Sequence, residues 1–190
     1  MKEQLYTIPL NDAINANDEC PFCFIERNVE QDLLDFVLGS GSSYMESDIR
    51  EATDKAGFCR SHFKKMFDYG NTLGNGWILK THFLHMNKQM HDQFRSFVPQ
   101  KTPLMGKLKK NAAQRSSIGV WAKEQEKSCY ICKRFEDTYD RYLDTFFVMY
   151  KKDGECRKNV KNGKGFCLPH FVDLCDAAES RLKKKKKAEF

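Results

Sequence analysis

The sequence contains no hydrophobic segment long enough to cross a membrane. Its longest apolar run, Phe146–Tyr150, has five residues, whereas a transmembrane helix needs about 20. The first 15 residues, MKEQLYTIPLNDAIN, also lack the apolar stretch and the small-residue cleavage site of a secretory signal peptide. These absences predict a cytoplasmic protein without a transmembrane segment.

Recognisable catalytic motifs are also missing. The sequence has no G-x-S-x-G nucleophile elbow, no H-E-x-x-H motif, no P-loop and no G-x-G-x-x-G dinucleotide motif. Only five of the 190 residues are proline, while 41% are hydrophobic and 13% are aromatic, which is enough to build a helical core. We therefore expect a folded, mainly α protein, and the sequence offers no positive case for an enzyme.

The net charge of +6 comes from two basic segments. Residues 95–118 and 181–187 each contain six basic and no acidic residues, and the rest of the chain has 20 basic and 26 acidic residues. Such segments favour a polyanionic partner, either nucleic acid or an acidic protein surface, although a solubilising linker or tail would have the same composition. The candidate contact residues are Lys107, Lys109, Lys110, Arg115, Arg181, Lys183, Lys184, Lys185, Lys186 and Lys187.

Six of the eight cysteines belong to a motif that occurs twice. CPFC at residues 20–23 precedes GFCRSHF at 57–63, and CYIC at 129–132 precedes GFCLPHF at 165–171. The copies are offset by 109 residues at the first element and by 108 at the second. In a reducing compartment, cysteines at such spacings indicate metal ligands rather than disulfides.

Each copy of the motif is predicted to provide the four ligands of one zinc ion. The CxxC element is typical of a tight knuckle, and the CxxH element predicts two ligands on one face of a helix at its positive N-terminus. The predicted sites are Cys20, Cys23, Cys59 and His62 in the first copy, and Cys129, Cys132, Cys167 and His170 in the second. Four protein ligands leave no open position, so we expect two structural Zn²⁺ ions, with an iron-sulphur cluster as the alternative.

The other cysteines and histidines have simpler interpretations. A thioredoxin-like role for either CxxC would need a βαβ context, and Phe24 and Lys133 stand where covalent haem attachment requires histidine. Cys175 is expected to be a packed small residue and Cys156 a loop thiol, with redox sensing or an alternative ligand role as the rival interpretation. His82, His85 and His91 are expected on a partly exposed polar helix face, because no cysteine or carboxylate joins them.

The motif copies also repeat their helical surroundings. Short helices are predicted at PLNDAINAN and IGVWAKEQEK before each CxxC, and apolar stripes after it, from Ile25 to Phe36 and from Phe135 to Phe146. A helix over 45–56 has a weaker counterpart near 155–160, and the helix after CRSH extends to about Phe94, with glycines that favour a kink. The predicted organisation is a first zinc-binding helical unit at 1–96, a basic linker at 97–117, a second unit at 118–182 and a basic tail at 183–190.

Together, CPFC, CYIC, GFCRSHF, GFCLPHF and the opening LYTIPLNDA resemble an uncharacterised family of small proteins from anaerobic Gram-positive bacteria, a domain of unknown function. The resemblance implies a bacterial cytoplasmic protein and no particular activity. The ligand order is also similar to that of treble-clef zinc modules, which have a β-hairpin where this sequence is helical.

The function that these features favour is that of a non-enzymatic, zinc-stabilised adaptor. It would contact nucleic acid or a protein partner through helical surfaces and the basic segments. Two alternatives stay open: a redox- or zinc-responsive thiol regulator, and an enzyme with an unrecognised active site. The oligomeric state is not indicated by the sequence.

Overall fold

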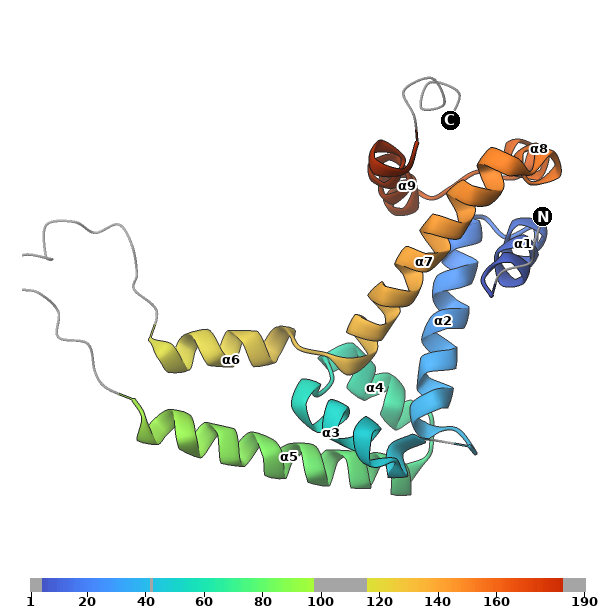
Figure 1. Ribbon diagram of the computed structural model, residues 1–190. Helices are drawn as coiled ribbons and strands as arrows, with labels where there is room; N and C mark the ends of the chain where they lie inside the picture. Colours follow the sequence, from blue (N-terminus) through green and yellow to red (C-terminus); the bar gives the residue numbers. More distant parts are fainter. Residues whose placement is uncertain (1–4, 42, 98–115, 183–190) are drawn as a thin grey trace, which may run out of the picture. The chain divides into compact units, whose positions relative to one another are not determined.

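The computed structural model describes residues 5–41, 43–97 and 116–182, and every regular element within these ranges is helical (Figure 1). The mainly α class predicted from the sequence is confirmed. The elements in chain order are α1 (Thr7–Asn15), α2 (Pro21–Leu38), the short 3₁₀ helix η1 (Ser43–Met45), α3 (Ser47–Ala56), α4 (Arg60–Asp68), α5 (Thr72–Arg95), α6 (Ser117–Lys127), α7 (Tyr130–Lys152), α8 (Gly154–Asn162) and α9 (Leu168–Arg181). None of these helices is both long and apolar enough to span a bilayer.

The described residues form two compact units. Unit 1 combines those of Met1–Leu33 with those of Arg134–Phe190, and unit 2 comprises those of Leu34–Lys133. The units therefore do not follow the order of the motif copies, on which the division at 1–96 and 118–182 was based. Helices α2 and α7 each contribute residues to both units.

Unit 1 has an aromatic core between α2 and α7, which run side by side in Figure 1. The Phe22 ring is fully buried, and its centroid lies 5.7 Å from Tyr139, 5.5 Å from Phe146 and 6.1 Å from Phe166. Burying one such ring stabilises a fold by about 1.5–3 kcal/mol relative to leaving it exposed. Ile25 and Phe146, from the two predicted stripes, belong to this core, whereas Phe36, the last residue of the first stripe, is exposed.

Unit 2 is built around α3 and α5, with Ile49 and Ile78 buried. The helix expected to continue from CRSH is divided into α4 and α5 at Gly70, whose φ of 87° an L-residue rarely adopts. Asn71 then caps α5: its Oδ1 accepts from the Gly74 N–H at 2.9 Å, and its Nδ2 donates to the Leu38 carbonyl at 2.7 Å.

The helix predicted to be weak near residues 155–160 is regular in the structure. Asp153 Oδ1 accepts hydrogen bonds from the N–H groups of Glu155 and Cys156 at 2.9 and 3.2 Å, which satisfies donors that a helix start otherwise leaves unpaired. Capping therefore compensates for the poor helix propensity of the sequence RKNVKN. The two predicted short helices before the CxxC elements are present as α1 and α6.

Candidate metal centres

Two groups of four cysteine and histidine side chains come together, one in each unit. Site 1, in unit 1, consists of Cys20, Cys23, Cys167 and His170; site 2, in unit 2, consists of Cys59, His62, Cys129 and Cys132. In each site the ligand atoms all lie within 4.8 Å of one another. All eight predicted ligands fall in these two groups, and each group could hold a metal ion.

Every pair of ligands sits at the start of a helix. Cys20, Cys59, Cys129 and Cys167 each accept, through the backbone carbonyl, the N–H of the residue four positions later, at 2.9–3.2 Å. Each therefore occupies the N-cap position, and the second ligand of each pair lies three residues on, in the first turn. This agrees with the prediction for CxxH and corrects it for CxxC, which opens a helix instead of forming a separate knuckle.

The convergence of two helix N-termini on each site favours negative charge there. The partial positive charge at a helix start stabilises thiolates, and each site receives it from two helices: α2 and α9 at site 1, and α4 and α7 at site 2. A site at two helix N-termini therefore stabilises three thiolates better than a site at a single helix N-terminus would.

Distances between ligand atoms fit a tetrahedral ion. Zinc bonds of about 2.3 Å to sulfur and about 2.05 Å to nitrogen place sulfurs about 3.8 Å apart and sulfur about 3.6 Å from nitrogen. In site 1, Cys23 Sγ lies 3.6 Å from Cys167 Sγ, and the three sulfurs lie 3.0–3.4 Å from His170 Nδ1. In site 2, Cys59 Sγ lies 3.8 Å from Cys132 Sγ, and the three sulfurs lie 3.2–3.4 Å from His62 Nδ1.

The electrostatics of the thiols also call for a cation. Burial, reinforced by the neighbouring thiols, raises the pKa of Cys23 and of Cys132 to about 12. At Cys59 burial acts in the same direction, but hydrogen bonds from Ser61 and the His62 N–H outweigh it and lower the pKa to about 6. Hydrogen bonding to Cys129 raises the pKa of His62 to about 9 against the effect of burial. A dication would reverse the repulsion that keeps all three thiols from ionising together.

One ligand of site 1 has an outer partner that sequence reasoning missed. Glu26 Oε1 lies 3.2 Å from His170 Nε2, the ring nitrogen that faces away from the sulfurs. A carboxylate in this position fixes the tautomer and orientation of a metal-binding imidazole. The available signal was spacing: Glu26 follows Cys23 by three residues on α2, which places both on one helix face.

The predicted assignment of ligands to sites is wrong. Each CxxC pairs with the CxxH of the other copy, and not with its own. The physical reason is helix length: the 18 residues of α2 extend about 27 Å from Cys20, and the following α3, with ten residues, extends only about 15 Å. The 23 residues of α7 and the nine of α8 separate the second pair in the same way.

The two other thiols and His82 also differ from expectation, whereas His85 is half-buried and His91 exposed, as predicted. Cys156 is buried in α8 and Cys175 is exposed on α9, the reverse of the predicted environments, because the capped helix turns Cys156 into the core. Burial raises the pKa of the Cys156 thiol to about 11. His82 is buried, and its Nδ1 lies 2.9 Å from the Asp54 carbonyl.

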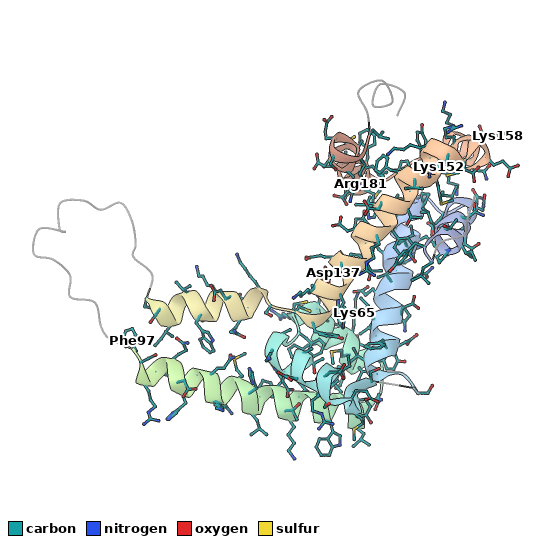
Figure 2. All side chains as sticks on the ribbon, viewed as in Figure 1. Lys65, Phe97, Asp137, Lys152, Lys158 and Arg181 are labelled. Carbon is teal, nitrogen blue, oxygen red and sulfur yellow. The ribbon has the colours of Figure 1, made fainter. Side chains whose placement is uncertain are left out.

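Of the predicted polyanion contacts, only Arg181 lies within the described residues. Arg181 is labelled in Figure 2. Its guanidinium pairs with Asp144 through Nε and lies 3.5 Å from Asp140 through Nη2, so its charge is already compensated. The other nine, Lys107, Lys109, Lys110, Arg115, Lys183, Lys184, Lys185, Lys186 and Lys187, lie outside the described residues.

The chain belongs to the family of unknown function DUF6062, whose model matches residues 1–190. This agrees with the resemblance to an uncharacterised family seen in the sequence. No curated protein and no solved structure matches the chain.

Proposed function

We propose that the protein is a non-enzymatic binding protein stabilised by two Zn²⁺ ions, one in each Cys3His site. The observation that supports this most directly is that all eight ligands are used in two complete sets of four. Three soft thiolates and one imidazole at tetrahedral distances suit zinc, and a closed set leaves no position for substrate or activated water.

In this proposal each ion links residues that are far apart in the sequence. Site 1 joins residues 147 positions apart in the sequence, Cys23 and His170, and site 2 joins Cys132 to His62 across 70 positions. Closing such loops costs conformational entropy, which metal binding offsets because the ion binds the assembled site. Zinc-binding free energy thereby contributes to the folding of units with modest cores.

Partner binding would use the helical surfaces and the basic segments. On α5 the side chains of Phe83 and Phe94 are 54% and 60% exposed, and large exposed apolar side chains that gather on one surface are typical of protein contacts. The basic segments would contact nucleic acid or an acidic protein surface, since arrays of lysine displace counterions from polyanions.

Elemental analysis of protein purified without added metal tests the zinc assignment. We expect two equivalents of zinc per chain, one after Cys59→Ser or His170→Ala, and two after the control substitution Cys175→Ala, because Cys175 lies in neither site. Iron together with visible absorbance would assign a cluster instead, and unchanged zinc in both ligand variants would refute the proposed sites.

Removing residues 183–187 tests the polyanion contact. Binding to mixed-sequence RNA or DNA should weaken, and its dependence on salt concentration should become shallower, because fewer counterions are released. An affinity and salt dependence equal to those of the full chain would leave the tail as a solubilising segment. Binding to an acidic protein with none to nucleic acid would assign the other partner class.

A second candidate function is that of a thiol-responsive regulator, because each site contains two cysteine sulfurs that lie close together. Cys23 and Cys167 lie 3.6 Å apart, and Cys59 and Cys132 lie 3.8 Å apart. Peroxide could oxidise each pair to a disulfide, with two thiols losing two electrons and two protons while one peroxide becomes two waters, and the ion would be released. Reversible zinc release under mild peroxide, restored by a dithiol, would favour this role over that of an adaptor.

A further inference from the structure

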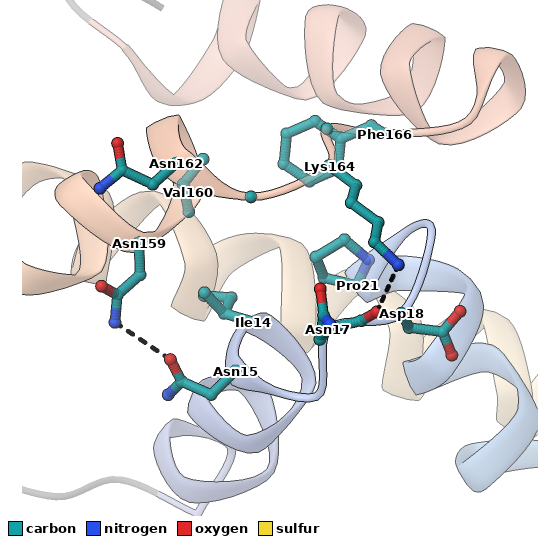
Figure 3. Close-up of a pocket in the computed structure, with 12 residues that line it drawn as sticks. Ile14, Asn15, Asn17, Asp18, Pro21, Asn159, Val160, Asn162, Lys164 and Phe166 are labelled. Atoms are coloured by element: carbon teal, nitrogen blue, oxygen red, sulfur yellow. Dashed lines mark hydrogen bonds between the residues drawn. The ribbon is translucent and has the colours of Figure 1, made fainter.

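A cavity of about 210 Å³ opens in unit 1 between the end of α1, the start of α2 and the loop from α8 to α9 (Figure 3). Its rim includes Pro21 and Phe166, which are the neighbours of the metal ligands Cys20 and Cys167. Asparagine side chains and one lysine contribute most of its polar groups. The metal site uses none of these polar side chains.

The cavity can be compared with the equivalent place in unit 2, because the two motif copies align residue by residue. Pro21 corresponds to Tyr130 and Gly165 to Gly57. In unit 2 the Tyr130 N–H donates to the Gly57 carbonyl at 2.9 Å, and the Tyr130 side chain is buried. Proline has no N–H, so unit 1 cannot form the equivalent bond.

The space beside the equivalent glycines, Gly57 and Gly165, is also filled in unit 2 and open in unit 1. A Cβ atom added to Gly57 would lie 2.6 Å from His82 Cε1, a side chain of α5, whereas a Cβ on Gly165 would meet nothing within 4 Å. Unit 2 therefore fills the place that unit 1 leaves open. The cavity is a property of this unit, and not an unavoidable gap of the repeated fold.

The cavity carries hydrogen-bonding groups that are only partly used. Asn159 Nδ2 donates to Asn15 Oδ1 at 3.0 Å, and Lys164 Nζ reaches across the opening to donate to the Asn17 carbonyl at 2.9 Å (Figure 3). The side chains of Asn17 and Asn162 bond to no other residue in the described part of the chain. Planar carboxamide groups therefore remain available beside a movable ammonium group.

The opening also has one lysine that can contact an anionic ligand. Asp18 lines the same cavity, and its carboxylate pairs with the Arg27 guanidinium. Lys164 forms no ion pair with a described residue, although its charge interacts electrostatically with that of Asp18. A lysine ammonium is a common partner of phosphate.

We propose that this cavity binds a nucleotide, with the base against the apolar lining residues Ile14 and Val160 and the phosphate at Lys164. Its volume is below the range of about 300–1,000 Å³ of drug-sized sites, which limits the enclosed part of a ligand to roughly one ring system. Asparagine carboxamides pair with the donor and acceptor edges of bases. The ligand could be a free mononucleotide or one nucleotide of a single strand, which share this chemistry.

Isothermal titration of the zinc-loaded full chain tests the site, with AMP, GMP, CMP and UMP, their nucleosides, and a short mixed-sequence oligonucleotide as probes. We expect saturable binding of at least one mononucleotide, and about tenfold weaker binding of its nucleoside, the effect of losing a hydrogen bond to a charged group. Lys164→Met should remove the difference between the two. Lys161→Met, an exposed lysine outside the cavity, should retain it.

Pro21→Tyr places in unit 1 the residue that unit 2 has at the equivalent position, Tyr130. This variant should abolish nucleotide binding while both metals stay bound. If that variant loses metal, Asn162→Ala at the exposed last residue of α8 provides the same test and should weaken binding about tenfold. An oligonucleotide that binds much more tightly than its mononucleotides, and is sensitive to the same variants, identifies a strand; equal affinity identifies a free nucleotide. The proposal is overturned if no probe saturates the protein up to millimolar concentration. It is also overturned if Pro21→Tyr and Asn162→Ala bind nucleotide as tightly as the unchanged protein. Neither result bears on metal content, which tests the proposed function separately.

Discussion

Sites 1 and 2 have the same ligands in the same helical positions, yet their outer contacts differ. Site 1 holds its histidine through Glu26, and the residue equivalent to Glu26 in the other copy is Phe135. Site 2 has a contact that site 1 cannot form: Ser61 Oγ lies 3.1 Å from Cys59 Sγ, and its equivalent is Pro169. The two sites therefore share their ligand set and differ in the residues beside it, with Glu26 at the imidazole of site 1 and Ser61 at a cysteine of site 2.

The largest effect is expected from variants that test which ligands share an ion. Cys20→Ser combined with His170→Ala should remove one equivalent of zinc, since both residues belong to site 1. Cys20→Ser combined with His62→Ala should remove both equivalents and unfold both units. Structural zinc binding contributes about 10–16 kcal/mol in zinc-finger peptides, so these losses should exceed those of any core substitution.

Metal content by mass spectrometry and thermal unfolding measure this difference. Pairing within each motif copy makes a different prediction, in which Cys20 and His170 belong to separate ions. A loss of two equivalents in the first double variant would therefore contradict the exchanged sites. Cys175→Ala serves as the control in both backgrounds, because the exposed Cys175 is no ligand.

The next largest effect compares the residues between the two cysteines. Phe22 and Ile131 occupy equivalent positions and are both fully buried. Phe22→Ala should destabilise unit 1 by about 3–5 kcal/mol and Ile131→Ala should destabilise unit 2 by about 2–5 kcal/mol. The Phe22 ring also lies 5.9 Å from the His170 ring, so its removal should loosen site 1 as well. Denaturant unfolding with zinc in excess measures both, and a larger loss in Ile131→Ala would reverse the expected order.

The helices and the ligand set were predictable because their signals are local. The stripe that begins at Ile25 predicted the buried face of α2 except at Phe36, which is exposed, and the spacing of CxxH placed two ligands in one helical turn. The same three-residue spacing holds for CxxC, and Cys20 and Cys129 cap helices just as Cys59 and Cys167 do. Treating CxxC as a knuckle overlooked the helical stripe that follows it directly.

The exchange of ligands was not predicted because the two copies are nearly equivalent locally. Any CxxC fits any CxxH as a set of four ligands, so the choice depends on distances along the chain. The length of α2 would have been informative, since the stripe already indicated a helix that carries the chain far from Cys20. The cavity beside Pro21 depends on packing against distant residues such as Asn159, for which the sequence has no local signal.

A smaller effect is expected from changing Glu26, the residue that contacts the site 1 histidine. Glu26→Gln should weaken zinc binding at site 1 by about 10- to 100-fold, because the outer carboxylate orients the imidazole and increases its basicity. Site 2 should retain its affinity. Competition with a chromophoric chelator resolves the two sites, and Glu136→Gln on α7 is a matched control because Glu136 has no contact with His170. Equal weakening at both sites would contradict the outer role of Glu26.

The smallest effect is expected at the ion pair that precedes α2 in unit 1. Asp18 pairs with Arg27, while the equivalent residues of the other copy are Lys127 and Glu136, with the charges reversed. The pKa of Asp18 is lowered from 3.8 by the Glu19 N–H and Arg27, so the stabilisation is full above 3.8 and is lost as the pH falls through the lowered pKa. Asp18→Asn should therefore reduce stability slightly at neutral pH and not at all once Asp18 is protonated. Denaturant unfolding across this pH range measures the difference, and because the pair is exposed, added salt should diminish it. A deficit that persisted at low pH would mean that Asp18 acts through its uncharged contacts at the start of α2 and not through its charge.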